Sequence, residues 1–433
     1  MGASSFLLCI MNQAAQPSTT PSSVRPAVRP LDGITVISLE HAIAAPFATR
    51  QLADMGARVI KIERPPMRNA DGSTSGGGDF ARGYDTRVNG LASHFVWTNR
   101  SKESLTLDLK HALAAPVLDK LLANADVLIQ NLAPGATARM GLAYGTLKQK
   151  FPRLIVCDIS GYGADGPQRD KKAYDLLIQS EAGFLSTTGT EESPSKAGIS
   201  VADIAAGMYA YSSILNALLL RGKTGDGSHI DISMLEALTE WMSFPLYYAY
   251  EGAPPPPRAG ASHATIYPYG PFKAGAGGTA AASVVLGLQN EREWATFCDK
   301  VLHDAALAKD ARFDSVSKRS NHRDALKALV EAAFGPLTAA EVEARLDLAG
   351  IGYGRMNDMA ALWAHPQLKA RKRWRTVDSS AGPLPALLPP GVSSAFEARM
   401  DAVPALGQHT AAILQEAGVS AGDIARLMAD GAA

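Results

Sequence analysis

The chain has 433 residues, 46% of them hydrophobic, which suits a folded protein of one or two domains and excludes a disordered or fibrous class. Its 42 Lys and Arg residues balance its 42 Asp and Glu residues, so neither nucleic acid nor a membrane surface is favoured as a general partner. The three cysteines, Cys9, Cys157 and Cys298, show no metal-ligand or disulfide spacing, and no apolar run approaches the roughly 18 residues that span a bilayer. We therefore expect a cytoplasmic protein without a metal or a permanently bound cofactor.

Strands and helices alternate through the first half of the chain, after a leader at residues 1–30 that we predict to be disordered because it is rich in Pro, Ser and Ala. This alternation is typical of an α/β fold in which helices cover a parallel sheet, and it predicts a large domain over residues 31–222. The predicted strands are 33–39, 58–63, 104–108, 126–130 and 154–158, and the predicted helices are 46–55, 111–124 and 204–220.

The pattern changes after residue 222, where a cluster of Gly, Lys and Asp marks a turn. A short strand at 228–233 and an apolar helix are followed by four consecutive prolines, which exclude helix and central strand. The rest of the half contains expected strands at 264–288, helices at 291–348, a turn at 350–355, a linker at 383–390 and one final helix at 407–418. We expect a linker and a small domain over residues 223–348, and a C-terminal segment at 349–433 that returns to the large domain.

Asp203 is the first candidate for a chemical role. Residues 199–201 are typical of the end of a buried strand, and the helix after them places Asp203 at its N-cap. There the backbone N–H groups and the positive end of the helix dipole favour the ionised carboxylate. Taken alone, the residue suits a structural cap as well as a reactive group.

Small and cationic residues follow several of the predicted strands. The turn at 40–46 consists largely of small residues, Arg64 ends the second strand, and Lys110, Asn131 and Arg139 come after later strands. Because the carboxyl ends of parallel strands meet at one edge of a sheet, these groups predict a site for a phosphorylated, mostly apolar ligand. The dinucleotide fingerprint G-x-G-x-x-G is absent from the turn at 40–46.

Six stretches of the chain share a pattern with one family. They are residues 52–64, 99–110, 131–142, 160–163, 198–207 and 404–410. Through them the chain resembles the family III CoA-transferases, a group that includes formyl-CoA transferase and the α-methylacyl-CoA racemases. The stretches 78–85, 92–97 and 261–270 are most similar to the mesaconyl-CoA C1–C4 transferase and its dicarboxyl-CoA relatives.

The resemblance implies a ring-shaped chain with a Rossmann-like large domain and a smaller α+β domain, two such rings interlocking as a homodimer. It implies that Asp203 is the nucleophile and that an acyl-CoA and a small carboxylate are the substrates. The CoA contacts that it implies are Ala42, Ile43, Arg64, Leu107, Lys110, Asn131, Leu132, Ala133, Arg139, Lys171, Lys172, Ala173 and Tyr174.

The branch of the family follows from one position. The racemases use a Gly-His-Asp segment whose His moves the α-proton, and the matching residues here are Ala173, Tyr174 and Asp175. A tyrosine, with an ordinary pKa of about 10, is a poor base near neutral pH, so the sequence favours transfer over racemisation. A CoA-binding protein without catalysis is a third alternative, which the intact Asp203 disfavours.

The substrate is predicted less directly. The long glycine-rich loop of formyl-CoA transferase has only a short counterpart at 274–278, equally typical of a hairpin turn, which disfavours formyl-CoA and oxalate. We expect a short dicarboxylic acyl group instead. Arg82 and His263 are the candidates for binding its second carboxylate, with His94 as a further possibility.

Overall fold

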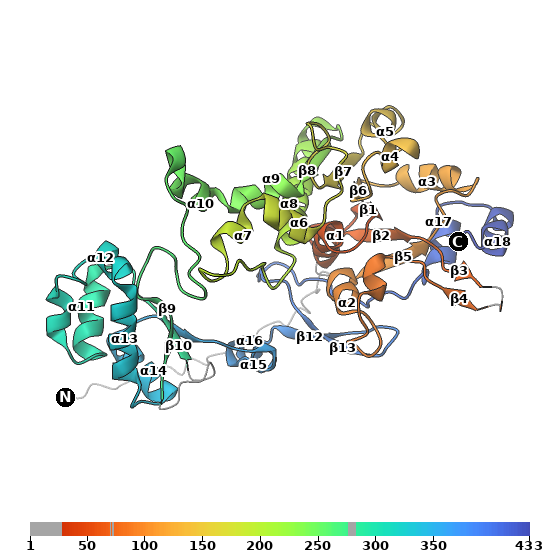
Figure 1. Cartoon of the computed structure of the whole chain (residues 1–433). Helices are drawn as coiled ribbons and strands as arrows, with labels where there is room; N and C mark the ends of the chain where they lie inside the picture. The colour runs from red at the N-terminus through yellow and green to blue at the C-terminus, as the bar shows by residue number, and fades with distance from the viewer. Residues whose placement is uncertain (1–27, 70, 72, 276–282) are drawn as a thin grey trace, which may run out of the picture.

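Six parallel strands form the central sheet of the large domain in the computed structural model, which describes residues 28–69, 71, 73–275 and 283–433 (Figure 1). The strands are β1 (Thr35–Leu39), β2 (Arg58–Glu63), β5 (Lys102–Thr106), β6 (Val127–Gln130), β7 (Ile155–Ser160) and β8 (His229–Ser233). Their order across the sheet is β5-β2-β1-β6-β7-β8, so the winding reverses between β1 and β6. Open sheets of this order bind ligands beside that reversal, at the carboxyl ends of the strands.

The α/β fold with a parallel sheet is thus confirmed, with one difference at its far edge. The large domain was expected to end at residue 222, yet β8 follows that residue and pairs in parallel with β7. Of the predicted leader, residues 1–27 lie outside the described residues.

Helices cover both faces of the sheet, as expected for strands that are apolar on both sides. In β1, for example, Val36 is buried in the core of one face and Ile37 in the core of the other. The first face is covered by α1 (Ala44–Asp54), α6 (Asp175–Glu181), α8 (Val201–Thr224) and α9 (Met234–Trp241). The second is covered by α3 (Ala114–Leu122), α5 (Tyr144–Lys150), α17 (Thr410–Glu416) and α18 (Ala421–Ala429).

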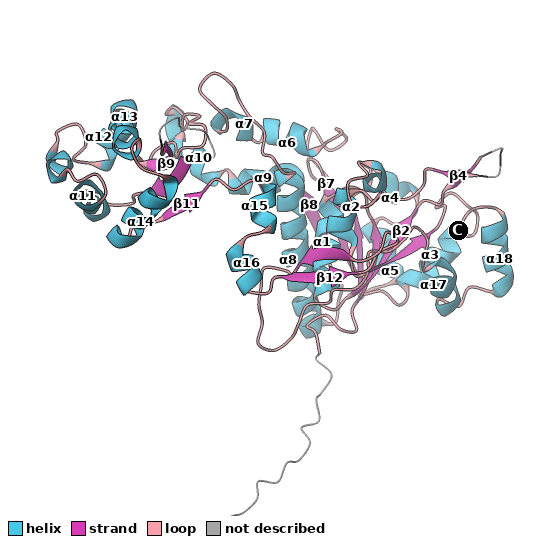
Figure 2. Cartoon of the chain, turned by 90° about the horizontal axis from the view of Figure 1, so that it is seen from below, coloured by secondary structure: helices cyan, strands magenta, loops and turns pink. Residues whose placement is uncertain are grey.

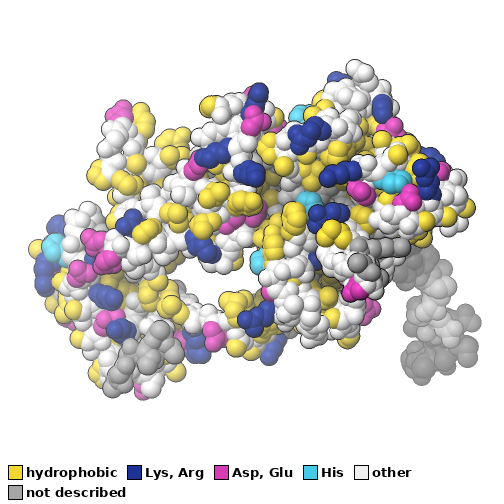
Figure 3. Space-filling model, turned by 45° about the vertical axis from the view of Figure 1, so that its right-hand side comes forward, with side chains coloured by type: hydrophobic (Ala, Val, Ile, Leu, Met, Phe, Trp, Pro, Cys, Tyr) yellow, Lys and Arg dark blue, Asp and Glu magenta, His cyan; other side chains and the backbone are white. Residues whose placement is uncertain are grey.

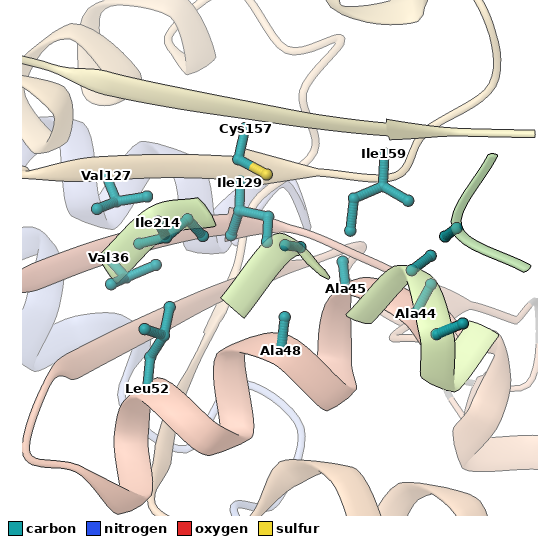
Figure 4. Packing of buried hydrophobic residues seen from close by; sticks show 14 of the residues in the cluster. Val36, Ala44, Ala45, Ala48, Leu52, Val127, Ile129, Cys157, Ile159 and Ile214 are labelled. Carbon is teal, nitrogen blue, oxygen red and sulfur yellow. The ribbon is translucent and has the colours of Figure 1, made fainter. Parts of the chain in front are cut away.

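Helices α1 and α8 pack closely against each other on the first face. Gly207 of α8 allows this, because a Cβ atom there would lie only 2.7 Å from the carbonyl oxygen of Ala44. Small side chains of α1, among them Ala45 and Ala48, join Ile214 of α8 and the strands in one core (Figure 4). Among the described residues, α8 is the one helix long and apolar enough to span a membrane, and 33% of its apolar window is buried.

The large domain and the segment that leaves it also contain several short elements. They are the hairpin β3 (Met67–Arg68) and β4 (Thr74–Ser75), η1 (Phe80–Gly83), α2 (Ser93–Asn99), α4 (Ala136–Arg139), α7 (Phe184–Thr187), α10 (Ser243–Tyr248) and η2 (Tyr250–Gly252). The two strands of the hairpin pair in antiparallel register.

The small domain is an α+β unit with its own core. Its antiparallel sheet contains β9 (Tyr269–Lys273), β10 (Ser283–Gly287) and β11 (Tyr353–Arg355), in the order β11-β10-β9. Its helices are α11 (Glu291–Lys300), η4 (Ala305–Lys309), α12 (Val316–Asn321), α13 (Arg323–Phe334) and α14 (Ala339–Ala349). Aromatic side chains such as Trp294, Phe297 and Phe334 fill its core. Part of the predicted glycine-rich turn, residues 276–278, lies outside the described residues.

Two connections join the small domain to the large one and enclose an opening, seen in the space-filling view (Figure 3). The outgoing connection contains α10, and the returning one contains α15 (Met359–Trp363), α16 (Pro366–Ala370) and the hairpin β12 (Trp374–Val377) and β13 (Leu384–Leu387). Seen from below, the two bodies lie at opposite ends of the molecule (Figure 2). The returning segment then reaches the large domain, where Leu414 and Leu427 are buried in the core beside α3.

Three local predictions were wrong. Residues 199–201 form no strand, since Ile199 is exposed and Val201 begins α8. The predicted linker 383–390 contains β13, where Pro385 is tolerated because the hairpin has two strands and both are edges. The chain ends in two helices, α17 and α18, and not in one.

Candidate active site

A large cavity lies at the reversal point of the sheet. Its volume is about 1460 Å³, and Leu39 at the end of β1 and Asn131 after β6 both line it. The ends of β2 and β7 contribute Glu63 and Ser160. The cavity therefore occupies the position where an open α/β sheet of this strand order binds its ligand.

All the residues that sequence analysis assigned to CoA line this one cavity, and so does Asp203. They come from seven separate segments of the chain, at positions 42–43, 64, 107–110, 131–133, 139, 171–174 and 203. Folding thus brings together the nucleophile and the CoA contacts that the resemblance implied.

Five cationic side chains stand at the exposed rim of the cavity: Arg64, Lys110, Arg139, Lys171 and Lys172. Lys171 forms an ion pair with Glu181. Within the described part of the chain, the other four side chains have no ion-pair or hydrogen-bond partner. Such uncommitted guanidinium and ammonium groups suit the phosphates of a nucleotide-like ligand.

Asp203 lies in the first turn of α8, three residues after the N-cap Ser200. Asp203 is therefore not the N-cap that the sequence predicted, and its anion is not stabilised as expected. Burial first, and then the negative charge of Asp175, raise the pKa of Asp203 to about 7. Among the described residues, no hydrogen-bond donor contacts its carboxylate. Asp203 is a poorly solvated acid facing a cavity, and its anion is correspondingly reactive.

Asp175 fixes the helix start that carries Asp203. Its Oδ1 accepts a hydrogen bond from the backbone N–H of Ala202 (2.8 Å), and its Oδ2 accepts one from the side chain of Gln179 (2.6 Å). Gln179 in turn accepts a bond from the backbone N–H of Ala197. This arrangement supplies the cap that Ser200 does not provide and keeps a second carboxylate beside Asp203.

The turn between β1 and α1 forms the opposite part of the lining. Asn131 clamps it, because its side chain accepts a hydrogen bond from the N–H of His41 and donates one to the carbonyl oxygen of His41, each at 2.9 Å. The Asn131 amide is thus used within the protein. The N-cap of α1, Ile43, offers no side-chain cap to the N–H groups that follow it.

Comparison with known proteins identifies the family of this chain. Residues 31–410 match the model of CoA-transferase family III. The chain belongs to that family. It is 33% identical over 441 residues to an acyl-CoA transferase of Fusarium pseudograminearum, covering 96% of this chain and 95% of the other.

A succinate–glutarate CoA-transferase of Agrobacterium fabrum is 32% identical over 391 residues, which is 89% of this chain and 95% of that one. The crystal structure of a CAIB/BAIF family protein from Brucella suis has the same fold, with a TM-score of 0.77 and 31% identity over 90% of this chain and 99% of the other. The predicted membership and fold are confirmed.

Arg82, which was expected to bind the second carboxylate of the substrate, lies outside the lining of this cavity. Its guanidinium donates two hydrogen bonds to Glu63, at 2.7 and 2.8 Å, and lies over the ring of Phe95 at 3.7 Å. It also contacts the carbonyl oxygen of Pro404, and it is not part of the cavity lining. Arg82 holds the C-terminal segment against the large domain.

His263 is also placed away from the cavity. Its Nδ1 accepts hydrogen bonds from the backbone N–H groups of Thr265 (3.2 Å) and Ile266 (3.0 Å), and its ring stacks on Tyr269. These contacts shape the entry to the small domain. The expectation that His263 binds substrate in this chain does not fit that position.

Sequence reasoning gave no binding or catalytic role to many residues of the lining, and His94 only a possible one. Among those without a role are His41, Phe80, Tyr84 and Asp175. Tyr84 lines the same cavity as Asp203, and burial, then the charges of Asp79, Asp203 and Tyr174, raise the pKa of its phenol. His94 packs edge-on against the Tyr84 ring at 5.6 Å. The available signal was the position of Tyr84 two residues after Arg82, in a stretch already singled out.

Proposed function

We propose that this enzyme transfers CoA between a short dicarboxylic acyl-CoA and a free carboxylate, with Asp203 as covalent nucleophile. The observation that carries the proposal is an unpartnered, poorly solvated carboxylate in the same cavity as the implied CoA contacts. The substrates for which the Agrobacterium relative is named, succinate and glutarate, support the dicarboxylic class.

The reaction proceeds through four acyl transfers. A carboxylate oxygen of Asp203 attacks the thioester carbonyl carbon, the C–S bond breaks, and CoA leaves as thiolate with a mixed anhydride on Asp203. The thiolate attacks the aspartyl carbonyl and releases the first acid, which leaves an aspartyl-CoA thioester. The acceptor carboxylate repeats both steps in reverse and regenerates Asp203. Covalent catalysis thus divides one difficult exchange into easier steps.

Burial of Asp203 contributes to these steps directly. An anion that is partly removed from water and left without hydrogen-bond donors is destabilised, and bond formation with the thioester carbon removes its charge. The negative charge of Asp175 adds to this destabilisation. The first attack therefore relieves both the poor solvation of the Asp203 anion and its repulsion by Asp175.

The cations at the cavity rim bind the phosphates of CoA. Losing one charge-assisted hydrogen bond costs roughly 1.5–3 kcal/mol, equivalent to about a ten- to hundredfold loss of affinity. The variants Arg64→Ala and Arg139→Ala should each raise the KM for a CoA ester more than they lower kcat. Unchanged affinity for CoA in both variants, measured by titration, would place CoA elsewhere.

The second carboxylate of the acyl group binds at His94 and Tyr84, which line the cavity, and not at Arg82, which does not. Each of these two lining side chains can donate a hydrogen bond to a carboxylate. A carboxylate taken out of water needs such a partner. His94→Phe should therefore lose activity with succinyl-CoA much more than with butyryl-CoA.

The protein acts as a homodimer. Large apolar side chains stand exposed on α9 and α10, at the base of the connection to the small domain, and a second copy of the chain is the partner that would bury them. They are Trp241, Phe244, Leu246, Tyr247 and Tyr248.

A CoA-exchange assay tests the function. The purified protein is incubated with succinyl-CoA and an excess of glutarate, and the CoA esters are separated and identified by mass spectrometry. We expect glutaryl-CoA to accumulate with the wild-type protein and not with Asp203→Asn. The proposal fails if no dicarboxylic ester is exchanged, or if butyryl-CoA is preferred to every dicarboxylic ester offered.

A further inference from the structure

One buried carboxylate joins two segments of the cavity lining. Oδ1 of Asp79 accepts hydrogen bonds from the backbone N–H groups of Ala42 (2.8 Å) and Ala81 (2.9 Å). Ala42 lies in the turn between β1 and α1, and Ala81 lies in η1, between the cavity residues Phe80 and Tyr84. Asp79 itself does not line the cavity. It can act on a ligand only through these two segments.

The first of these segments has an unfavourable backbone. Ala42 adopts a φ of 61°, the left-handed region, which side-chain-bearing residues avoid because Cβ crowds the following carbonyl group. Such a conformation persists only where the surroundings hold it. The N–H of Ala42 is held by Asp79, and the residue before it, His41, is held by Asn131.

A buried cation holds Asp79 in turn. Nζ of Lys61 lies 2.6 Å from Oδ2 of Asp79 and 3.2 Å from Oε1 of Glu40. Lys102 contacts the same Glu40 oxygen at 2.7 Å. All four side chains are fully buried. An unpaired charge at this depth is prohibitive, so the carboxylate of Asp79 is fixed between Lys61 and the two backbone N–H groups.

We propose that Asp79 is a positioning residue for the transfer reaction, which with Lys61 locks Ala42 in its left-handed conformation and so fixes the part of the cavity that receives the CoA thioester. This inference rests on the proposed function, because the CoA thioester is the ligand that the function names. Among the described residues, Asp54 also forms buried ion pairs, with Arg50 and Arg100, and these lie away from Ala42. The pair of Asp79 and Lys61 thus acts on binding and turnover, in addition to its contribution to folding.

Asp79→Asn removes the lock with little change of volume. If the amide oxygen faces the N–H groups of Ala42 and Ala81, the NH₂ group faces the ammonium of Lys61, and the reverse orientation loses both backbone bonds. We expect CoA affinity, measured by calorimetric titration of the full chain, and kcat/KM with succinyl-CoA each to fall at least tenfold. Glycine accepts a positive φ, so the double variant Asp79→Asn/Ala42→Gly should recover at least fivefold of each loss.

Asp54→Asn is the matched control. Asp54 is also fully buried and paired, with Arg50 and Arg100, but lies at the far end of α1 and outside the cavity lining. This variant should lower the Tm while leaving CoA affinity within twofold of wild type, and Ala42→Gly should not rescue it. Equal losses of CoA affinity in Asp79→Asn and Asp54→Asn, or no rescue of the former by Ala42→Gly, would overturn the proposal.

A second pair of variants applies if Asp79→Asn does not fold. Ala42→Gly keeps the left-handed turn accessible, whereas the β-branched side chain of Ala42→Val excludes it with the ion pair intact. We expect CoA to bind at least tenfold more weakly to Ala42→Val than to Ala42→Gly. Wild-type affinity in Ala42→Val contradicts the inference. Failure of the wild-type protein to bind CoA at all would instead refute the proposed function.

Discussion

At the scale of single residues, the site depends on a carboxylate that is costly to ionise. Asp203 stands in the first turn of a helix, where the dipole favours its anion, yet burial and the neighbouring Asp175 outweigh that effect. Because attack on a thioester requires the ionised form, the acid–base equilibrium of this one group sets the pH range of activity.

The charge of Asp175 should be visible in the pH profile. The raised pKa of Asp203, about 7, predicts that kcat/KM falls as the pH drops below neutrality. Asp175→Asn removes the repelling charge and should move this acid limb to lower pH. Asp119→Asn, which changes an exposed carboxylate paired with Lys150, should leave the limb in place. An acid limb that does not move in Asp175→Asn would contradict the electrostatic role of that residue.

The raised pKa of Asp203 also predicts that stability falls as the pH rises, whereas activity rises. Between about pH 4 and 7 the folded state binds a proton at Asp203 that the unfolded state has lost, so this group makes stability fall as the pH rises. Asp203→Asn should therefore stabilise the protein at pH 8 by about 1–4 kcal/mol and have little effect near pH 4. Denaturant unfolding at the two pH values measures this. Equal effects of the variant at the two pH values would show that ionisation of Asp203 does not destabilise the folded protein.

The residues of the site were only partly predictable from the sequence. Arg64 and Arg139 follow strands in the expected way, and their free side chains at the rim suit the ligand for which they were chosen. Arg82 has the right chemistry, but Glu63 neutralises it, and no spacing rule indicates that pairing across 19 positions. Tyr84 and Asp175 depend on long-range packing in the same way, because their importance comes from proximity to Asp203.

At the scale of elements, the contact between α1 and α8 positions the nucleophile. Gly207 lies one turn after Asp203, and a Cβ there would meet Ala44 and the ring of Phe47. Gly207→Ala should therefore separate the helices, cost roughly 1–3 kcal/mol of stability and lower kcat. Thermal unfolding and the exchange assay measure the two effects.

Gly222→Ala is the control in the same helix. A Cβ at Gly222 meets no atom within 4 Å, so alanine should raise stability by roughly 0.5–1 kcal/mol and leave kcat unchanged. If Gly207→Ala matches this control, the close approach of the two helices does not govern the site.

Elements with a strong hydrophobic pattern were predictable from the sequence. Elements that form only through pairing with a distant segment were not. The β-branched run of β2 was predicted with its observed bounds. Helix α1 begins at Ala44, two residues before the predicted proline start, because Pro46 lacks an N–H that the first turn would leave unpaired in any case. β13 contains Pro385 and was read as linker, since only its pairing with β12 makes it a strand.

At the scale of the whole molecule, the exposed aromatic side chains of α10 require a partner in the proposed homodimer. Light scattering after size exclusion should give twice the 45.6 kDa of the chain. The double variant Phe244→Glu/Tyr247→Glu places two charges in that surface and should shift the mass towards one chain. A single-chain mass for the wild-type protein, or an unchanged dimer in the double variant, would contradict this surface as the interface.

The central claim is that CoA transfer passes through a covalent bond to Asp203. The direct test is hydroxylamine trapping: the protein is mixed with succinyl-CoA without acceptor, treated with hydroxylamine, digested and analysed by mass spectrometry. Our account predicts a hydroxamate on Asp203 that requires the thioester and is absent from Asp203→Asn. Full transfer activity with Asp203 unmodified, or a trapped adduct on another residue, would contradict it.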